Sequence, residues 1–382
     1  MAAMAATSTK ATEPPTLSTT DRFGFFHLPP TTATSTSSYS PSTDPHRSIT
    51  LPSSLSLSQR KKRLHEDNRR VQKWLHMLEN WHTYRTGNRQ SKLKSRARKG
   101  IPDSLRSPSW LHLSGAKELK RQRPSHYTEL QQIETAPWEE QIILDVDRTF
   151  PNHVMFQTCG GEGQQQLLRI LRAYSLHDEE VGYCQGIGFI AAFLSTYMLE
   201  EDVFWMLVAL LRGERYNLSG LYRKGMPKAL STMSTMDRMI QKINPRMALH
   251  LQSLRIECPL YMTGWLLTLF TSDFPFDYVV RIFDIYICEG MKIVYRIVLA
   301  LLKEVSSTLL ALDFEHTLKS LQRLPIELSN VLTPDELIAK AIAVHITTAE
   351  IAAFEEEETS KMQKVQARRD SLRKQRLEKC EK

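Results

Sequence analysis

An arginine and a carboxylate lie three residues apart in the stretch IILDVDRTFP, where Asp145 precedes Arg148. If residues 139–149 form a helix, these side chains are neighbours on one face, and the carboxylate can hold the guanidinium. Pro151 disfavours helical backbone at Phe150, which places Arg148 in the last turn. The simplest interpretation is a surface ion pair stabilising by about 0.3–0.5 kcal/mol. The alternative is a cation presented to a partner.

A second stretch, VGYCQGIGFI, places Gln185 just before the predicted start of another helix. Backbone N–H groups at a helix start favour anions, and the glutamine amide can both donate and accept hydrogen bonds. The neighbouring Cys184 could act as a nucleophile, but no histidine partner for it is evident in the sequence. We therefore interpret Cys184 as an inert thiol.

The elements that must position these residues are predicted to be helices. From residue 135 to about 347 the apolar residues recur at helical spacing, and no strand-like alternation of comparable length competes. Ile142, Ile143 and Val146 form one apolar stripe, which we expect to face the core. No period of 30–47 residues repeats, which argues against a helical solenoid. The predicted fold class is all-α, with a single large helical domain.

Composition divides the chain into four parts. Residues 1–59 are rich in Ser, Thr and Pro, so we expect a disordered tail. Residues 60–99 read as a basic, amphipathic helical lead-in, residues 100–347 as the main domain, and residues 348–382 as a charged C-terminal helix or coiled coil. Within the main domain, Ser107 before Pro108 predicts a helix that begins at Ser107.

The positive charge of the chain is concentrated in the lead-in. Residues 60–99 contain 14 Lys and Arg and 3 Asp and Glu, a local charge of +11, whereas the whole chain carries +8. A solvated surface is the simplest interpretation of such a run, and contact with an anionic membrane or with a nuclear import receptor is the alternative. No zinc-finger spacing or ribonucleoprotein motif is present, so nucleic acid is not an expected partner.

The cysteines and the apolar runs indicate in which compartment the protein lies and whether it holds a metal site. The five cysteines are scattered without a CxxC pair, which favours a reducing compartment and supports no metal site. The longest apolar run, near IGFIAAFLSTYML, is shorter than the roughly 20 residues that a transmembrane helix needs. We expect a cytoplasmic protein with no transmembrane helix, and peripheral attachment to endomembranes is left open.

Four motifs in order resemble those of the TBC (Tre/Bub/Cdc) domain family, whose members are GTPase-activating proteins for Rab small GTPases. They are GIPxxLRxxxW, IxxDxxRTFP, YCQG and PFDYVVRIFDIYICEG, and the resemblance covers about residues 95–345. The sequence departs from the family pattern at Ser107–Pro108, at Phe283 and at Ile187, and none of these positions is an expected catalytic residue.

The resemblance implies an all-helical domain that inserts two side chains into a GTP-bound Rab. Arg148 matches the arginine finger and Gln185 the glutamine finger of the family. Asp145, Thr149, Tyr183 and Gly186 are expected to position these two residues or to contact the partner.

The resemblance also implies that the chain needs no cofactor, because GTP and Mg²⁺ belong to the partner GTPase. The stretch CGGEGQQQ lacks the GK[ST] ending of a phosphate loop, so we do not expect this chain to bind nucleotide itself. The predicted function is GTPase activation in vesicle transport rather than an enzyme activity of its own. The alternatives are a catalytically silent Rab-binding scaffold and a membrane adaptor that uses residues 60–99.

Overall fold

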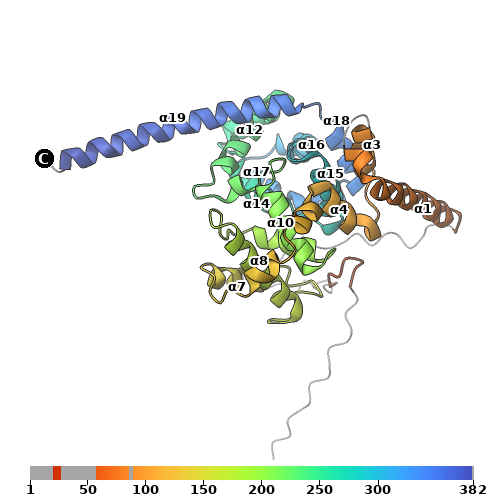
Figure 1. The fold of residues 1–382 in the computed structure, drawn as a ribbon. Coiled ribbons are helices and arrows are strands. Elements are labelled where there is room, and N and C mark those ends of the chain that lie inside the picture. The colour runs from red at the N-terminus through yellow and green to blue at the C-terminus, as the bar shows by residue number, and fades with distance from the viewer. Residues whose placement is uncertain (1–19, 27–56, 86–88, 381–382) are drawn as a thin grey trace, which may run out of the picture.

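The computed structural model describes residues 20–26, 57–85 and 89–380 (Figure 1). Within this part of the chain the regular elements are helices, and the only β-type pairings are isolated bridges at Thr20–Phe26 and Phe25–His153. The all-α prediction is confirmed. The helical periodicity of the sequence decides this outcome, because each apolar stripe can be buried only against another helix.

The first half of the described chain runs from the basic segment to the helices on either side of the predicted site residues. Its helices are α1 (Leu57–Glu79), α2 (Trp81–Arg85), α3 (Arg89–Arg98), the 3₁₀ turn η1 (Asp103–Leu105), α4 (Arg106–Ser114), α5 (Ala116–Gln122), α6 (His126–Gln131), α7 (Glu139–Asp147), α8 (Glu162–His177) and α9 (Ile187–Ser195).

The second half supplies most of the core and ends in a long helix. Its helices are α10 (Glu200–Arg212), α11 (Ser219–Tyr222), α12 (Pro227–Ile243), α13 (Pro245–Ser253), α14 (Pro259–Leu267), α15 (Phe276–Glu289), α16 (Lys292–Leu309), α17 (Phe314–Glu327), the 3₁₀ turn η2 (Leu328–Asn330), α18 (Pro334–Ala343) and α19 (Thr348–Cys380).

Three helices that are apolar on most sides form the centre of the core. In α10 every residue from Val203 to Leu211 is buried, α15 is buried along almost its whole length, and α16 is buried from Ile293 to Leu302. The sequence predicted this burial, because helices without a polar face cannot lie on a surface. The helix α7, which carries Asp145, lies at one edge of the domain (Figure 1), and α9, which follows Gln185, is buried against α8 and α10.

A buried carboxylate on α15 ties the first helices to the core. Asp284 is fully buried and accepts hydrogen bonds from the backbone N–H of Ile101 at 2.8 Å and from the Trp110 indole at 3.0 Å. The guanidinium of Arg106, itself buried, donates to the same carboxylate at 3.3 Å. These donors replace the water that the carboxylate loses on burial. We call Asp284, Ile101, Arg106 and Trp110 the scaffold network.

The predicted helix start at Ser107 is wrong. The helix α4 begins one residue earlier, at Arg106, after the 3₁₀ turn of Asp103–Leu105, and Ser107 makes no capping hydrogen bond. Pro108 lies in the first turn of α4, where its missing N–H would have no helical acceptor. Proline is therefore compatible with either start, and the scaffold network places Arg106 in the helix.

Part of the N-terminal tail is ordered, contrary to the prediction for residues 1–59. Thr20–Phe26 packs against the main domain, where Phe25 is 2% exposed, and α1 already begins at Leu57. A single buried aromatic side chain outweighs the polar composition around it. The rest of the predicted disordered tail, residues 1–19 and 27–56, lies outside the described residues.

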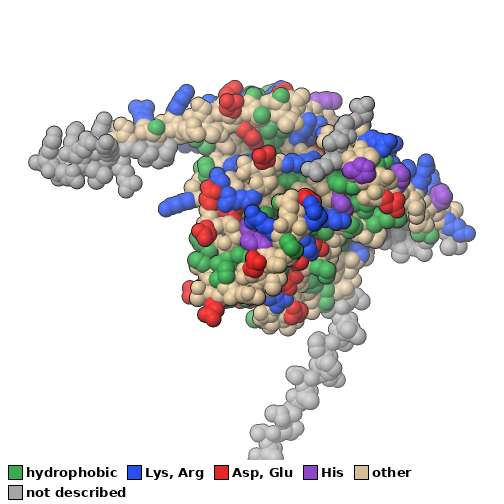
Figure 2. All heavy atoms as spheres, viewed as in Figure 1, with side chains coloured by type: hydrophobic (Ala, Val, Ile, Leu, Met, Phe, Trp, Pro, Cys, Tyr) green, Lys and Arg blue, Asp and Glu red, His purple; other side chains and the backbone are tan. Residues whose placement is uncertain are grey.

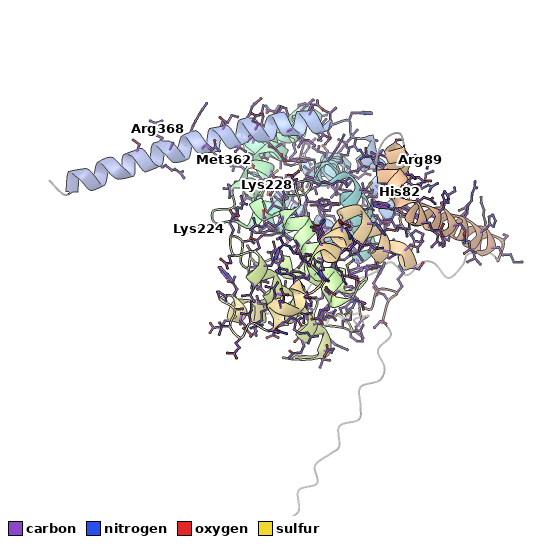
Figure 3. All side chains as sticks on the ribbon, in the orientation of Figure 1. His82, Arg89, Lys224, Lys228, Met362 and Arg368 are labelled. Carbon is purple, nitrogen blue, oxygen red and sulfur yellow. The ribbon has the colours of Figure 1, made fainter. Side chains whose placement is uncertain are left out.

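The C-terminal segment is helical, as its charge pattern predicted. The first half of α19 packs on α12, where Arg238 pairs with Glu357 at 2.6 Å and stacks over Phe354 at 4.1 Å. Lys228 of α12 and Met362 of α19 line a groove between the two helices (Figure 3). The C-terminal part of α19 extends away from the rest of the domain (Figure 1).

Among the described residues, no single helix has both the length and the apolar content needed to cross a membrane. One bent pair, Pro334–Ala343 with Thr348–Arg369, satisfies these criteria by length and composition only.

Candidate functional site

Arg148 caps the C-terminal end of α7. The helix ends at Asp147, and Arg148 has φ −100° and ψ 1°, so the predicted extension to Thr149 is wrong by two residues. The side chain of Arg148 is 54% exposed, whereas that of its partner Asp145 is 8% exposed. The guanidinium therefore reaches solvent from a buried anchor.

Asp145 connects two segments that are far apart in the sequence. One carboxylate oxygen, Oδ1, accepts a hydrogen bond from Nη2 of Arg148. The other, Oδ2, accepts from the hydroxyl of Tyr183 at 2.7 Å. Burial and the bond to Asp145 both raise the pKa of Tyr183, so its hydroxyl stays protonated and remains a donor. The predicted ion pair is confirmed, and it extends to a third residue.

The backbone turns sharply directly after Arg148. Thr149 is buried, and its hydroxyl donates to the backbone carbonyl of Asp145 at 2.6 Å, which satisfies one of the last acceptors of α7. Phe150 follows with a φ of 49°, in the left-handed region that phenylalanine rarely adopts. Its ring is 2% exposed, so packing around the ring holds this backbone in place.

Gln185 is exposed in the turn directly before α9, as predicted from the sequence. The side chain has no hydrogen-bond partner among the described residues, so its amide is available to a partner molecule. Gly186 has a φ of 108°, and a Cβ at this position would lie 2.9 Å from the carbonyl oxygen of Leu267. Only glycine fits this turn without strain. Burial raises the pKa of the adjacent Cys184, which keeps it a thiol, as expected.

The apolar stripe predicted for α7 is correct at two of three positions. Ile142 and Val146 are buried, but Ile143 is 44% exposed. Ile142 and Val146 are four residues apart and share a helix face, whereas Ile143 is rotated by one residue onto the solvent side. The adjacent Leu144 is 70% exposed, one turn before Arg148. An apolar surface therefore accompanies the exposed cation.

The sequence did not predict the aromatic contact between the two site segments. The rings of Phe150 and Phe189 lie 5.5 Å apart in an edge-to-face arrangement. Phe150 is two residues after Arg148, and Phe189 is four residues after Gln185. The only signal in the sequence was an apolar residue between Thr149 and Pro151, which composition alone could not assign to this contact.

The arrangement presents the Arg148 cation and the neutral Gln185 amide on neighbouring segments. The buried residues Asp145, Tyr183 and Phe150 support these segments from the protein side. An exposed guanidinium can stabilise developing negative charge on a phosphate, and an amide can orient a water molecule. In the part of the chain that the structure describes, no group of three or more His, Cys, Asp or Glu side chains could hold a metal ion.

Known proteins resemble this chain in both sequence and fold. TBC1 domain family member 10B of Mus musculus is 35% identical over 305 residues, 78% of this chain and 37% of that protein. TBC1 domain family member whacked of Drosophila melanogaster is 35% identical over 234 residues, 61% of this chain and 63% of that protein. The chain thus spans less than two thirds of the length of either relative.

Solved structures agree. The crystal structure of the Chlamydomonas flagellar RabGAP TBC domain is 28% identical, with a TM-score of 0.60, and the match covers 76% of this chain and 97% of that one. The Ypt/Rab-GAP domain of Gyp1p shares the fold, with a TM-score of 0.60 at 23% identity. The family model described as the Rab-GTPase-TBC domain matches residues 103–310, more than half of the sequence. This chain belongs to the Rab-GTPase-TBC domain family.

Proposed function

We propose that this protein accelerates GTP hydrolysis on a Rab-family small GTPase in its GTP-bound state, with Arg148 and Gln185 as the two catalytic fingers. The observation that carries the proposal is the geometry of Arg148, whose charge is 54% exposed while its partner Asp145 is buried. A guanidinium fixed at one end and free at the other can enter the nucleotide site of a partner without losing much conformational entropy.

Arg148 would stabilise the charge that develops during phosphoryl transfer. GTP hydrolysis passes through a loose transition state in which negative charge accumulates on the leaving and transferring oxygens. A delocalised cation with forked donors matches these oxygens, and arginine fingers accelerate hydrolysis by about 10³–10⁵. Asp145 and Thr149 would act as positioning residues, because they fix the end of α7 from which Arg148 projects.

Gln185 would orient the attacking water. Its amide oxygen can accept a proton of the water while its NH₂ donates to a γ-phosphate oxygen. Gly186 would let the backbone turn so that Gln185 faces the partner, and Tyr183 would fix this turn to Asp145. The backbone N–H groups at the start of α9 add a partial positive charge that favours a phosphate nearby.

The partner would supply the remaining chemistry. GTP and Mg²⁺ would be carried by the GTPase, so this chain would be an activator that contributes residues in trans rather than an enzyme with a substrate of its own. The exposed Leu144 and Ile143 beside Arg148 would bury apolar surface against the GTPase. The protein would thereby switch off a Rab in vesicle transport.

The basic lead-in would attach the protein to anionic endomembranes. The cations of α1 and α3 are close enough to lower the pKa of Lys73, with Arg69 as the largest cause and Arg96 and Lys99 contributing. Arg70 and Arg98 pair with Asp67 and Glu289, and an anionic surface would neutralise the remaining cations of the cluster. Figure 2 shows Lys and Arg side chains over the region of α1 and α3. Flotation with phosphatidylserine vesicles at low and high salt tests this attachment.

Single-turnover GTP hydrolysis on a panel of purified, GTP-loaded Rabs tests the proposed function. The full chain should accelerate one or a few Rabs, and the double variant Arg148→Ala, Gln185→Ala should not. Arg148→Ala removes one partner of the buried Asp145, which keeps the hydroxyl donor of Tyr183, so circular dichroism and melting of the variant check that the fold is retained.

Other outcomes favour the alternatives. Tight binding to a GTP-loaded Rab without acceleration would indicate a silent Rab-binding scaffold. Full acceleration by the double variant would overturn the two-finger mechanism while leaving the activity itself in place. Membrane flotation without Rab binding would favour the membrane adaptor.

A further inference from the structure

A short segment far upstream of the main domain lies against the loop that follows Arg148. Residues 20–26, TDRFGFF, form a compact turn in which the Asp21 side chain accepts from the backbone N–H of Phe23 at 2.8 Å and of Phe25 at 3.0 Å. In Figure 1 this segment is drawn in red at the edge of the domain. The turn presents Phe25 toward the body of the protein.

The segment is hydrogen-bonded to residues 152–154, directly after the predicted finger. The N–H of Phe26 donates to the carbonyl of Asn152 at 3.0 Å, and the N–H of Val154 donates to the carbonyl of Gly24 at 2.9 Å. The ring nitrogen Nε2 of His153 lies 2.8 Å from the carbonyl of Phe23. These bonds form an antiparallel pairing between two short strand-like segments.

The backbones can approach this closely only because residue 24 is a glycine. Gly24 has a φ of 95°, and a Cβ there would lie 2.9 Å from Nε2 of His153 and 3.0 Å from a methyl group of Val154. Any other side chain would be strained by the positive φ and would push the segment away. The docking surface is therefore shaped for this turn.

Phe25 begins a chain of aromatic contacts that reaches the segments following both predicted fingers. Its ring packs edge to face on Phe150 at 5.7 Å, and it also contacts Phe276 of α15 at 5.3 Å. Phe150 in turn packs on Phe189 of α9 at 5.5 Å. Phe25 thus contacts the loop that follows Arg148 directly, and Phe150 connects it to Phe189 in the helix that follows Gln185.

We propose that residues 20–26 are a positioning element for Arg148, docked in cis, that holds the loop after α7 in its catalytic geometry. This inference rests on the proposed function, because it assigns a role to the segment within that mechanism. Phe150 has an unfavourable positive φ, so the loop keeps this conformation only while its neighbours hold the ring. Phe25 covers one side of that ring, and the hydrogen bonds at Asn152 and Val154 fix the backbone next to it.

The test compares three phenylalanine variants in the full chain. Phe25→Ala should lower the kcat of the GTP hydrolysis that this protein stimulates on the Rab roughly 10- to 100-fold with little change in KM, because small misplacements of a catalytic group cost rate rather than binding. Phe25→Leu keeps apolar volume and should restore most of the rate. Phe354→Ala removes a partly buried ring from α19, on the far side of the domain, and should leave kcat unchanged.

Hydrogen exchange measured by mass spectrometry tests the same proposal and does not require a GTPase. Phe25→Ala should exchange faster at residues 148–156 and 185–190, with α15 and α16 unchanged. The same regional pattern in Gly24→Ala, which adds only one methyl group, would support docking as the cause.

The two measurements separate the failure of each proposal. If Phe25→Ala has the kcat and the exchange of the wild type, the positioning role is overturned. A kcat loss that Phe354→Ala shares at equal destabilisation would overturn it as well, since the effect would then be general. If the wild type accelerates no Rab, the proposed function fails, and the exchange data alone decide whether the segment holds the loop.

Discussion

Two buried aspartates, Asp284 and Asp145, each form an ion pair with an arginine, but the two arginines differ in their exposure to solvent. Asp284 binds Arg106, whose side chain is 7% exposed, and also the indole of Trp110. Asp145 binds Arg148, whose side chain is 54% exposed, and also the hydroxyl of Tyr183. Both carboxylates thus combine an arginine with an aromatic donor, but only one of the arginines reaches solvent.

The difference lies in what each network satisfies within the chain. Arg106 is enclosed by the protein, so its bonds serve to join α4 to α15. Arg148 uses only part of its donor set on Asp145, and the remaining N–H groups face solvent beside the exposed Leu144. In this pair of networks the enclosed arginine joins two helices, whereas the exposed arginine keeps donors that a partner could use.

Arg148→Lys should give the largest effect on activity. Lysine keeps the charge but lacks the forked donors. We therefore expect the rate of stimulated hydrolysis to fall almost as far as it would without the arginine, by about 10³–10⁵-fold. Melting should be unchanged, because residue 148 is exposed. Single-turnover hydrolysis and a thermal melt of the same sample measure both. A variant with full activity would break the comparison between the two networks.

Asp284→Ala should give the largest effect on stability. The change removes the buried one of the two carboxylates that pair with Arg106, and it leaves the Trp110 indole and the Ile101 N–H without their acceptor; breaking comparable buried pairs costs about 3–5 kcal/mol. Asp145→Ala should cost less, since water can solvate the exposed Arg148. Urea unfolding of both variants measures the difference. Equal losses of unfolding free energy would show that the exposure of the arginine does not matter.

Tyr183→Phe should produce a smaller change confined to the site. Removing the hydroxyl deletes the donor to Asp145 and should destabilise the protein by about 1 kcal/mol. Stimulated hydrolysis should fall roughly tenfold, which corresponds to about 1.4 kcal/mol of transition-state free energy. The control is Tyr127→Phe, which removes a hydroxyl bonded to Glu200 at 2.6 Å, outside both networks. A similar loss of activity in the control would contradict a positioning role for Tyr183.

Mild acid should give the smallest effect on stability. It should increase local opening of the loop after Arg148 before it affects the scaffold network. Burial lowers the pKa of His153 below its ordinary value of 6.5, so the folded loop opposes protonation. The contribution of His153 to stability is therefore complete above about pH 6.5 and declines as the pH falls below that value. The scaffold network contains no histidine, and its titratable carboxyl is that of Asp284, whose pKa burial raises above the ordinary value of an aspartate.

Hydrogen exchange at pH 7.5 and 5.5, corrected for the intrinsic rates, should show faster opening at residues 150–156 than in α15. His153→Gln retains a donor and an acceptor without titrating, and it should remove this pH dependence. Faster exchange of α15 instead would place the acid-sensitive group in the scaffold.

The sequence by itself determined the fold class and the ion pair of the candidate site. Helical periodicity and the absence of strand patterns predicted an all-α domain, because local spacing decides which faces a helix can bury. The spacing of Asp145 and Arg148 predicted their ion pair, because residues three apart on a helix are neighbours. Such inferences succeed where the partners are close in sequence.

The tertiary structure decided the contacts between residues distant in sequence. The bond from Tyr183 to Asp145 spans 38 positions, and that from Trp110 to Asp284 spans 174. Composition placed residues 1–59 in a disordered tail, yet Phe25 is buried against the loop that follows Arg148. The periodicity of α7 likewise could not tell that Ile143 faces solvent. No local pattern encodes these outcomes, because each depends on which surfaces the whole chain brings together.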